Sequence, residues 1–75
     1  MKLLLIEWLD ARSHGNAWTH EEDFAPGLAR CRSVGWLHGE DRASLTLVSS
    51  LAPEQVGGDI TIPKACIVKR TTLKA

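Results

Sequence analysis

The sequence predicts a single small, mainly β domain over residues 1–75, whose short strands close into a five-stranded barrel. Two observations lead to this prediction. Aliphatic, β-branched and Trp residues gather in short extended runs, and the segments between these runs are rich in Gly, Pro, Asn and Asp. A chain of 75 residues supports only one core, so no second domain is expected.

The first run, residues 3–12, is expected to form a partly buried strand because aliphatic residues dominate it and charged residues interrupt it. Residues 13–16 indicate a turn. Thr19 and Glu22 have the spacing of a capping box, which predicts one short helical turn near residues 19–25. The following Pro26 and Gly27 should end that turn.

In the middle of the chain, residues of two kinds alternate from position 28 to position 37, which predicts a strand with two distinct faces. One side carries Cys31, Ser33, Gly35 and Leu37, and the other carries Arg30, Arg32, Val34 and Trp36. We expect the first side to face inward, with Gly35 permitting the bend that closes a small barrel. Residues 39–42 indicate a hairpin connection, after which Leu45 and Leu47 should face the core.

The last third predicts a loop over residues 50–58, a short strand over 59–62, a 3-10 turn near 63–66 and a final strand over 67–73. Pro63 marks the interruption between the two strands. A strand, one helical turn and a strand form the ending expected of an SH3-like barrel. That architecture is preferred over an OB-like barrel and over an open sheet with a helix.

Composition places the chain among globular domains, with 44% hydrophobic and 24% charged residues. Nine basic and nine acidic residues cancel, so binding to nucleic acid or an anionic membrane would need a local patch. The apolar run of residues 3–6 is too short for a membrane span or a signal peptide. We therefore expect a cytoplasmic protein with no membrane association.

No catalytic or metal-binding pattern stands out, and we predict neither enzyme activity, nor a metal, nor a cofactor. His14, His20 and His38 have no common zinc-ligand spacing, even with the two cysteines added. Cys31 and Cys66 are expected to be small buried side chains, with a disulfide between them as the alternative.

Trp36 is the leading candidate binding residue, because the strand pattern places it outward and exposed Trp side chains often anchor interfaces. The alternative is that residues 13–27 cover it, with Phe24 against the indole. Four cationic residues complete the candidate binding set: Arg30, Arg32, Lys69 and Arg70. An aromatic side chain among cations on a barrel face is typical of single-stranded nucleic-acid binding.

Three segments resemble a group of small uncharacterised bacteriophage and prophage proteins: residues 7–11 (EWLDA), residues 34–37 (VGWL) with Glu40-Asp41, and residues 62–64 (IPK) with Ile67. The matches span nearly the whole chain. The resemblance implies a short phage-encoded SH3-like protein that works in the bacterial cytoplasm. It implies no activity and no catalytic residues.

Together these observations favour a non-enzymatic binding module, a phage or prophage accessory protein that engages a host or phage protein. The segment 13–27 or a barrel face would make the contact. The alternative function is single-stranded nucleic-acid binding by a small barrel. A homo-oligomer formed through an unpaired edge strand is a third hypothesis.

Overall fold

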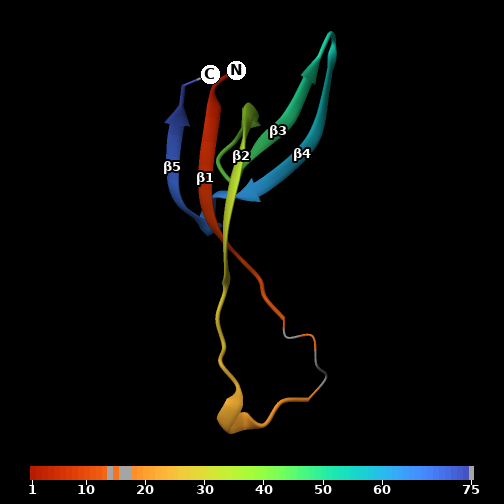
Figure 1. The fold of residues 1–75 in the computed structure, drawn as a ribbon. Coiled ribbons are helices and arrows are strands. Elements are labelled where there is room, and N and C mark those ends of the chain that lie inside the picture. Colours follow the sequence, from red (N-terminus) through yellow and green to blue (C-terminus); the bar gives the residue numbers. More distant parts are fainter. Residues whose placement is uncertain (14, 16–17, 75) are drawn as a thin grey trace.

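The computed structural model describes residues 1–13, 15 and 18–74, and it confirms a mainly β protein (Figure 1). In chain order the elements are β1 (Leu3–Asp10), the 3-10 turn η1 (Glu21–Asp23), β2 (Ala29–Glu40), β3 (Ser44–Ala52), β4 (Gln55–Pro63), the 3-10 turn η2 (Lys64–Cys66) and β5 (Ile67–Leu73). Both helical turns fall where the sequence predicts them. The predicted turn over residues 13–16 lies partly outside the described residues.

The five strands form one antiparallel sheet in the order β4-β3-β2-β1-β5. Strands β1 to β4 pair in succession as hairpins, and β5 returns to lie beside β1, so that Leu3 is in register with Leu73. The predicted closure into a barrel is wrong. In the described part of the chain β4 pairs with β3 and β5 pairs with β1, which leaves these two strands at opposite edges of an open, curved sheet (Figure 1).

The core lies on the inner face of this curved sheet. Leu4 and Ile6 of β1 meet Leu45 and Leu47 of β3 and Ile62 of β4, and each of the five is at most 1% exposed. Their period-2 spacing is what places them on one face. The predicted inward direction of Leu45 and Leu47 is thereby confirmed.

Gly35 lies where β3 crosses closely over β2. A Cβ atom built at Gly35 would come 2.8 Å from the carbonyl oxygen of Val48 and 3.1 Å from the Cβ of Leu47. The two strands can therefore approach because residue 35 has no side chain. The predicted bend that closes a barrel at Gly35 is not present, since the sheet stays open, and the structure shows close packing between strands there instead.

The predicted loop over residues 50–58 is wrong, because β3 and β4 continue through it as a hairpin. Ala52 pairs with Gln55, which leaves only Pro53 and Glu54 in the turn. Proline supplies the negative φ of the first turn residue, and Glu54 takes the left-handed conformation with φ 62°. Residues typical of loops here form one tight turn and an exposed hairpin.

The turn after β2 is held by one carboxylate. Asp41 Oδ1 accepts hydrogen bonds from the backbone N–H groups of Ala43 and Ser44, at 2.8 and 2.9 Å. These two bonds lower the pKa of Asp41. The strand extends to Glu40, so the hairpin connection is shorter than the predicted range 39–42.

Glu40, at the end of β2, links the two sides of the open sheet. Its carboxylate accepts two hydrogen bonds from the Arg70 guanidinium, both 3.1 Å long, and lies 2.9 Å from Lys64 Nζ. The Arg70 and Lys64 cations lower the pKa of Glu40 to about 2. The ion cluster therefore joins β2 to β5 and η2 where backbone pairing does not.

Between β1 and β2, the described residues 11–13, 15 and 18–28 extend away from the sheet as an arm with η1 at its far end (Figure 1). The capping-box prediction is wrong: η1 begins after His20, and no side chain caps it. The first N–H groups of η1 belong to exposed residues, where water can bind them, so the turn forms without a side-chain cap. The arm contributes to a molecule 52 Å long and only 23 by 21 Å across.

Candidate functional site

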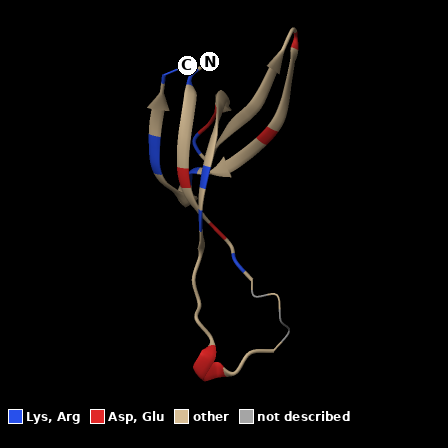
Figure 2. Ribbon diagram, in the orientation of Figure 1, with Lys and Arg blue, Asp and Glu red and all other residues tan. Residues whose placement is uncertain are grey.

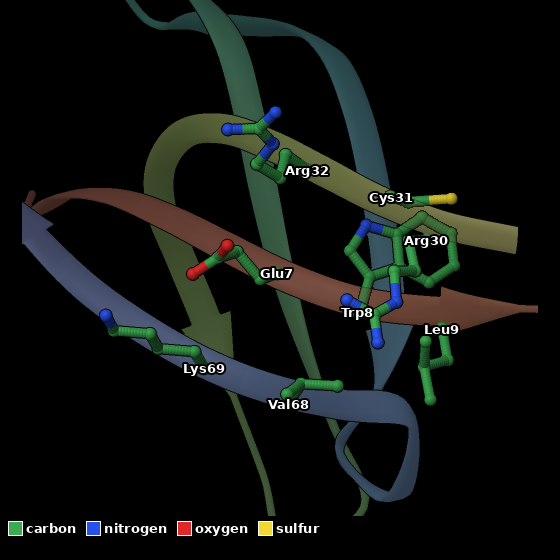
Figure 3. Close-up of a pocket in the computed structure, with 8 residues that line it drawn as sticks. All are labelled: Glu7, Trp8, Leu9, Arg30, Cys31, Arg32, Val68 and Lys69. Carbon is green, nitrogen blue, oxygen red and sulfur yellow. The ribbon is translucent and has the colours of Figure 1, made fainter.

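The outer face of β2, β1 and β5 carries a row of charged side chains. Glu7 on β1 is in register with Arg32 on β2 and with Lys69 on β5. Residues directly opposite each other in antiparallel strands project to the same face. A carboxylate is therefore flanked by two cations, one on each neighbouring strand (Figure 3).

This row borders a pocket near the point where the arm leaves the sheet, which we call the basic groove. Its volume is about 630 Å³, and its lining residues are Glu7, Trp8, Leu9, Arg30, Cys31, Arg32, Val68 and Lys69 (Figure 3). The lining combines three cations, one carboxylate and an apolar part. Such a site suits a ligand that is both anionic and apolar.

A β-bulge shapes the β5 wall of the basic groove. The register between β1 and β5 shifts between Glu7 and Trp8, so that Glu7 faces Lys69 while Trp8 faces Ile67. The shift leaves Val68 as the extra residue. Because a bulge re-aims side chains, Val68 and Lys69 can both line the groove although they are neighbours in sequence.

Trp8 connects the basic groove to the core. Its indole Nε1–H donates a 3.0 Å hydrogen bond to the hydroxyl of Ser33 on β2, and its ring packs against the buried cluster. The hydrogen bond satisfies the one polar group of a half-buried ring and fixes its orientation. This wall of the groove is therefore held in place without a ligand.

The structure brings together three of the five predicted binding residues. Arg30, Arg32 and Lys69 line the basic groove, and none of the three forms an ion pair with a described residue. Arg70 does not join them. It is in register with Ile6, whose side chain is in the core, and its guanidinium is held by Glu40 on that face.

Trp36 lies on the outer face as predicted, but outside the basic groove. It is four residues beyond Arg32 on β2, or about 13 Å along the strand. The prediction that residues 13–27 cover it is wrong, because the arm extends away from the sheet (Figure 1). Trp36 is half-buried instead, in register with Leu3 on one side and buried Val48 on the other.

Trp18 is the functional candidate that sequence reasoning missed. It lies on the arm and is 91% exposed, the highest value among the large hydrophobic residues described. Phe24 and Leu28, also on the arm, are at least half exposed. Its position in the sequence could have indicated this exposure, because Trp18 lies in a long polar connection with no alternating pattern that could bury it.

The part of the chain that the structure describes contains no group of three His, Cys, Asp or Glu side chains placed to hold a metal ion. His14 lies outside the described residues. Cys31 and Cys66 are both free and half-buried, so the disulfide alternative is not present. No described helix is long and apolar enough to cross a membrane.

Comparisons with protein-family models, with curated proteins and with solved structures find no match to this chain. The fold and the groove therefore define a class only: a small antiparallel β protein with an arm and a basic groove on one sheet face.

Proposed function

We propose that this chain is a non-enzymatic binding module that engages another protein through its arm. The sheet would serve as an open SH3-like scaffold, consistent with a meander whose first and last strands pair and with the single 3-10 turn before β5. The observation that carries the proposal is the surface that this fold leaves uncovered.

The protein exposes more surface than a compact chain of its size. Its accessible surface is 6041 Å², whereas a compact 8.2 kDa monomer exposes roughly 4,500 Å². Its radius of gyration is 15.9 Å, against roughly 11 Å for a compact domain of the same length. The arm and the β3–β4 hairpin account for the elongated shape (Figure 1).

Trp18 supplies the contact residue. Tryptophan is enriched among residues whose truncation weakens protein interfaces most, because its large side chain gains much from losing water. An almost fully exposed Trp at a projecting segment is therefore costly for a free monomer and useful for a complex.

The resemblance to small bacteriophage and prophage proteins supports the cellular part of the proposal. We propose a phage or prophage accessory protein that works in the bacterial cytoplasm, with a host or phage protein as partner. The residues that carry this resemblance lie on or directly beside β1, β2, β4, η2 and β5, so the resemblance concerns mainly the scaffold.

The test is capture of partners from a bacterial lysate with the immobilised chain, followed by mass spectrometry. The native chain should retain a specific protein, and Trp18→Ala should lose most of it. Leu51→Ala, on the exposed β3–β4 hairpin, is the matched control and should behave like the native chain. Equal capture by the native chain and Trp18→Ala would contradict the role of the arm.

The basic groove favours a second candidate, single-stranded nucleic-acid binding. Three cations around an apolar lining offer phosphate contacts and a surface for a base. An oligonucleotide should then bind at low salt, and Arg32→Gln should lower the slope of log affinity against log salt by roughly one. Trp36→Ala tests whether bases stack farther along β2. The absence of any binding at 50 mM salt would exclude this function.

A further inference from the structure

The arm tip, residues 18–24, and the basic groove carry opposite charge. Glu21, Glu22 and Asp23 are all exposed in η1, with no basic residue in that turn. Three cations surround the groove against the single carboxylate of Glu7. Figure 2 shows the acidic tip at the far end of the arm and the basic residues on the sheet near its base.

The apolar parts of the two surfaces also match. The groove offers Leu9, Val68 and part of Trp8 beneath its cations. Val68 is 67% exposed, so this lining is open to a partner side chain. Trp18 precedes the acidic turn by three residues and is the bulkiest exposed side chain described. A volume of about 630 Å³ is within the range of sites that accept a bulky ring.

We propose that the partner in the basic groove is a second copy of this chain, whose arm tip docks there in a reciprocal dimer. Trp18 of each copy enters the groove of the other, and the acidic turn meets Arg30, Arg32 and Lys69. The inference rests on the proposed function, since it uses the arm as a docking element. It adds a second copy of this chain as a specific partner, and it adds the surface that receives the arm.

The placement of the two surfaces favours a closed dimer. The groove lies at the base of the arm and the acidic tip at its far end (Figures 1 and 2). Two copies with their arms side by side and antiparallel would bring each tip to the base of the other arm. A two-fold axis makes the two contacts identical, and such symmetry is the commonest in oligomers.

The exposed area is sufficient for such a dimer. The excess over a compact monomer is roughly 1,500 Å² per chain, from the compact value given above. A standard stable interface buries about 800 Å² per partner. An interface of that size would therefore use about half of the excess exposed surface of each copy.

The experiment is a charge exchange followed by analytical ultracentrifugation at low salt. Glu21→Lys with Glu22→Lys reverses the tip, and Arg30→Glu with Arg32→Glu reverses the groove. Each variant alone should be monomeric where the native chain is dimeric. A one-to-one mixture should form a heterodimer, because in it the reversed tip meets the reversed groove and the native tip meets the native groove.

Matched controls separate this contact from a general effect of charge. The control for the reversed tip is Glu54→Lys with Asp59→Lys, and the control for the reversed groove is Arg42→Glu with Lys74→Glu. Each makes the same change in net charge as the variant it matches, at exposed positions away from the tip and groove. Both controls should remain dimeric. If Arg32→Glu disturbs folding beside Glu7, Arg30→Glu with Arg32→Gln replaces it. Circular dichroism checks each fold.

Trp18→Ala provides a second measurement that involves no change of charge. It should raise the dimer dissociation constant by roughly a thousandfold, because the substitution removes two symmetric contacts and each interface residue of high energy is worth roughly thirtyfold. Higher salt should also weaken the native dimer, because the contact pairs exposed charges.

Three results would overturn the dimer. These are a monomeric native chain at millimolar concentration, charge-reversed variants that remain as dimeric as their controls, and a mixture that fails to associate. The second result would instead indicate pairing through the β4 or β5 edge. If lysate capture still depended on Trp18, the proposed function would survive the failure of this inference.

Discussion

The chain segments that form β1 and β2 belong to the packed sheet over one part of their length, and they continue beyond it into the exposed arm. Within the sheet, Leu4 and Ile6 are covered by Leu45 and Leu47 of β3, and they are fully buried. Beyond Asp10 and Ala29 the same two segments separate into the arm, whose described hydrophobic residues are mostly exposed. The difference shows that these two segments form a core only where they are paired and where β3 also covers one face. A crossing strand must cover one face.

The largest effect should come from removing a side chain on the covered part. Ile6→Ala deletes a fully buried side chain and should cost about 2–5 kcal/mol of unfolding free energy. Leu28→Ala, on the arm at 58% exposure, should change it by less than about 0.5 kcal/mol. Urea denaturation of both variants measures the contrast, and similar losses would mean that the arm contributes to the core.

Gly35 and Gly39 offer a sharper contrast within one strand. Gly35→Ala places a Cβ against a backbone carbonyl of β3 and should cost about 1–3 kcal/mol. Gly39→Ala meets nothing within 4 Å, and it should be neutral or stabilise by about 0.5 kcal/mol. Thermal unfolding compares them. A harmless Gly35→Ala would show that β3 does not cross as closely as described.

A smaller effect is expected at the boundary between core and groove. Ser33→Ala removes the acceptor of the Trp8 indole N–H and should cost about 1 kcal/mol. Trp8→Phe removes the donor as well as part of the ring. The double variant should lose less than the sum of the two single losses, since both remove the same hydrogen bond. Additive losses in urea titrations would show that the bond contributes nothing.

The smallest effect concerns pH, because the Glu40 cluster is exposed to solvent. The pKa of Glu40 is lowered to about 2, so its contribution to stability is complete above the unfolded value near 4.5. It should be lost as the pH falls from 4.5 toward 2. Melting temperatures of the native chain should therefore drop more steeply in that range than those of Glu40→Gln. Arg70→Gln should give an intermediate profile, because Lys64 still pairs with Glu40, and a native-like slope in Glu40→Gln would contradict the ion cluster.

The fold was predictable where the pattern is local. Alternation over residues 28–37 correctly separates the two faces of β2, and Pro63 correctly marks the break before η2. The hairpin at residues 50–58 was missed because Pro53 and two glycines occur both in loops and in tight hairpins. Closure of the barrel depends on how β4 and β5 approach each other, which no short pattern encodes.

The candidate site was predictable in part for the same reason. Arg30 and Arg32 are two residues apart on one strand, so their shared face follows from the sequence. Lys69 and Arg70 are adjacent, so regular alternation allows only one of them on that face. Whether Lys69 or Arg70 lies on the face of the groove depends on the register of β5 with β1, and the bulge beside Trp8 sets that register. The sequence contains no signal for this bulge.

The pairing of Leu3 with Leu73 has a practical consequence. It places the first and last strands side by side, with both ends of the chain at the end of the sheet opposite the arm (Figure 1). A short linker should therefore join the segments beyond Leu3 and Leu73 without crossing the basic groove, and new ends could be opened within the arm. In such a circularly permuted chain every strand of the sheet remains intact. Only the arm is cut, so the scaffold and its docking element become separable parts.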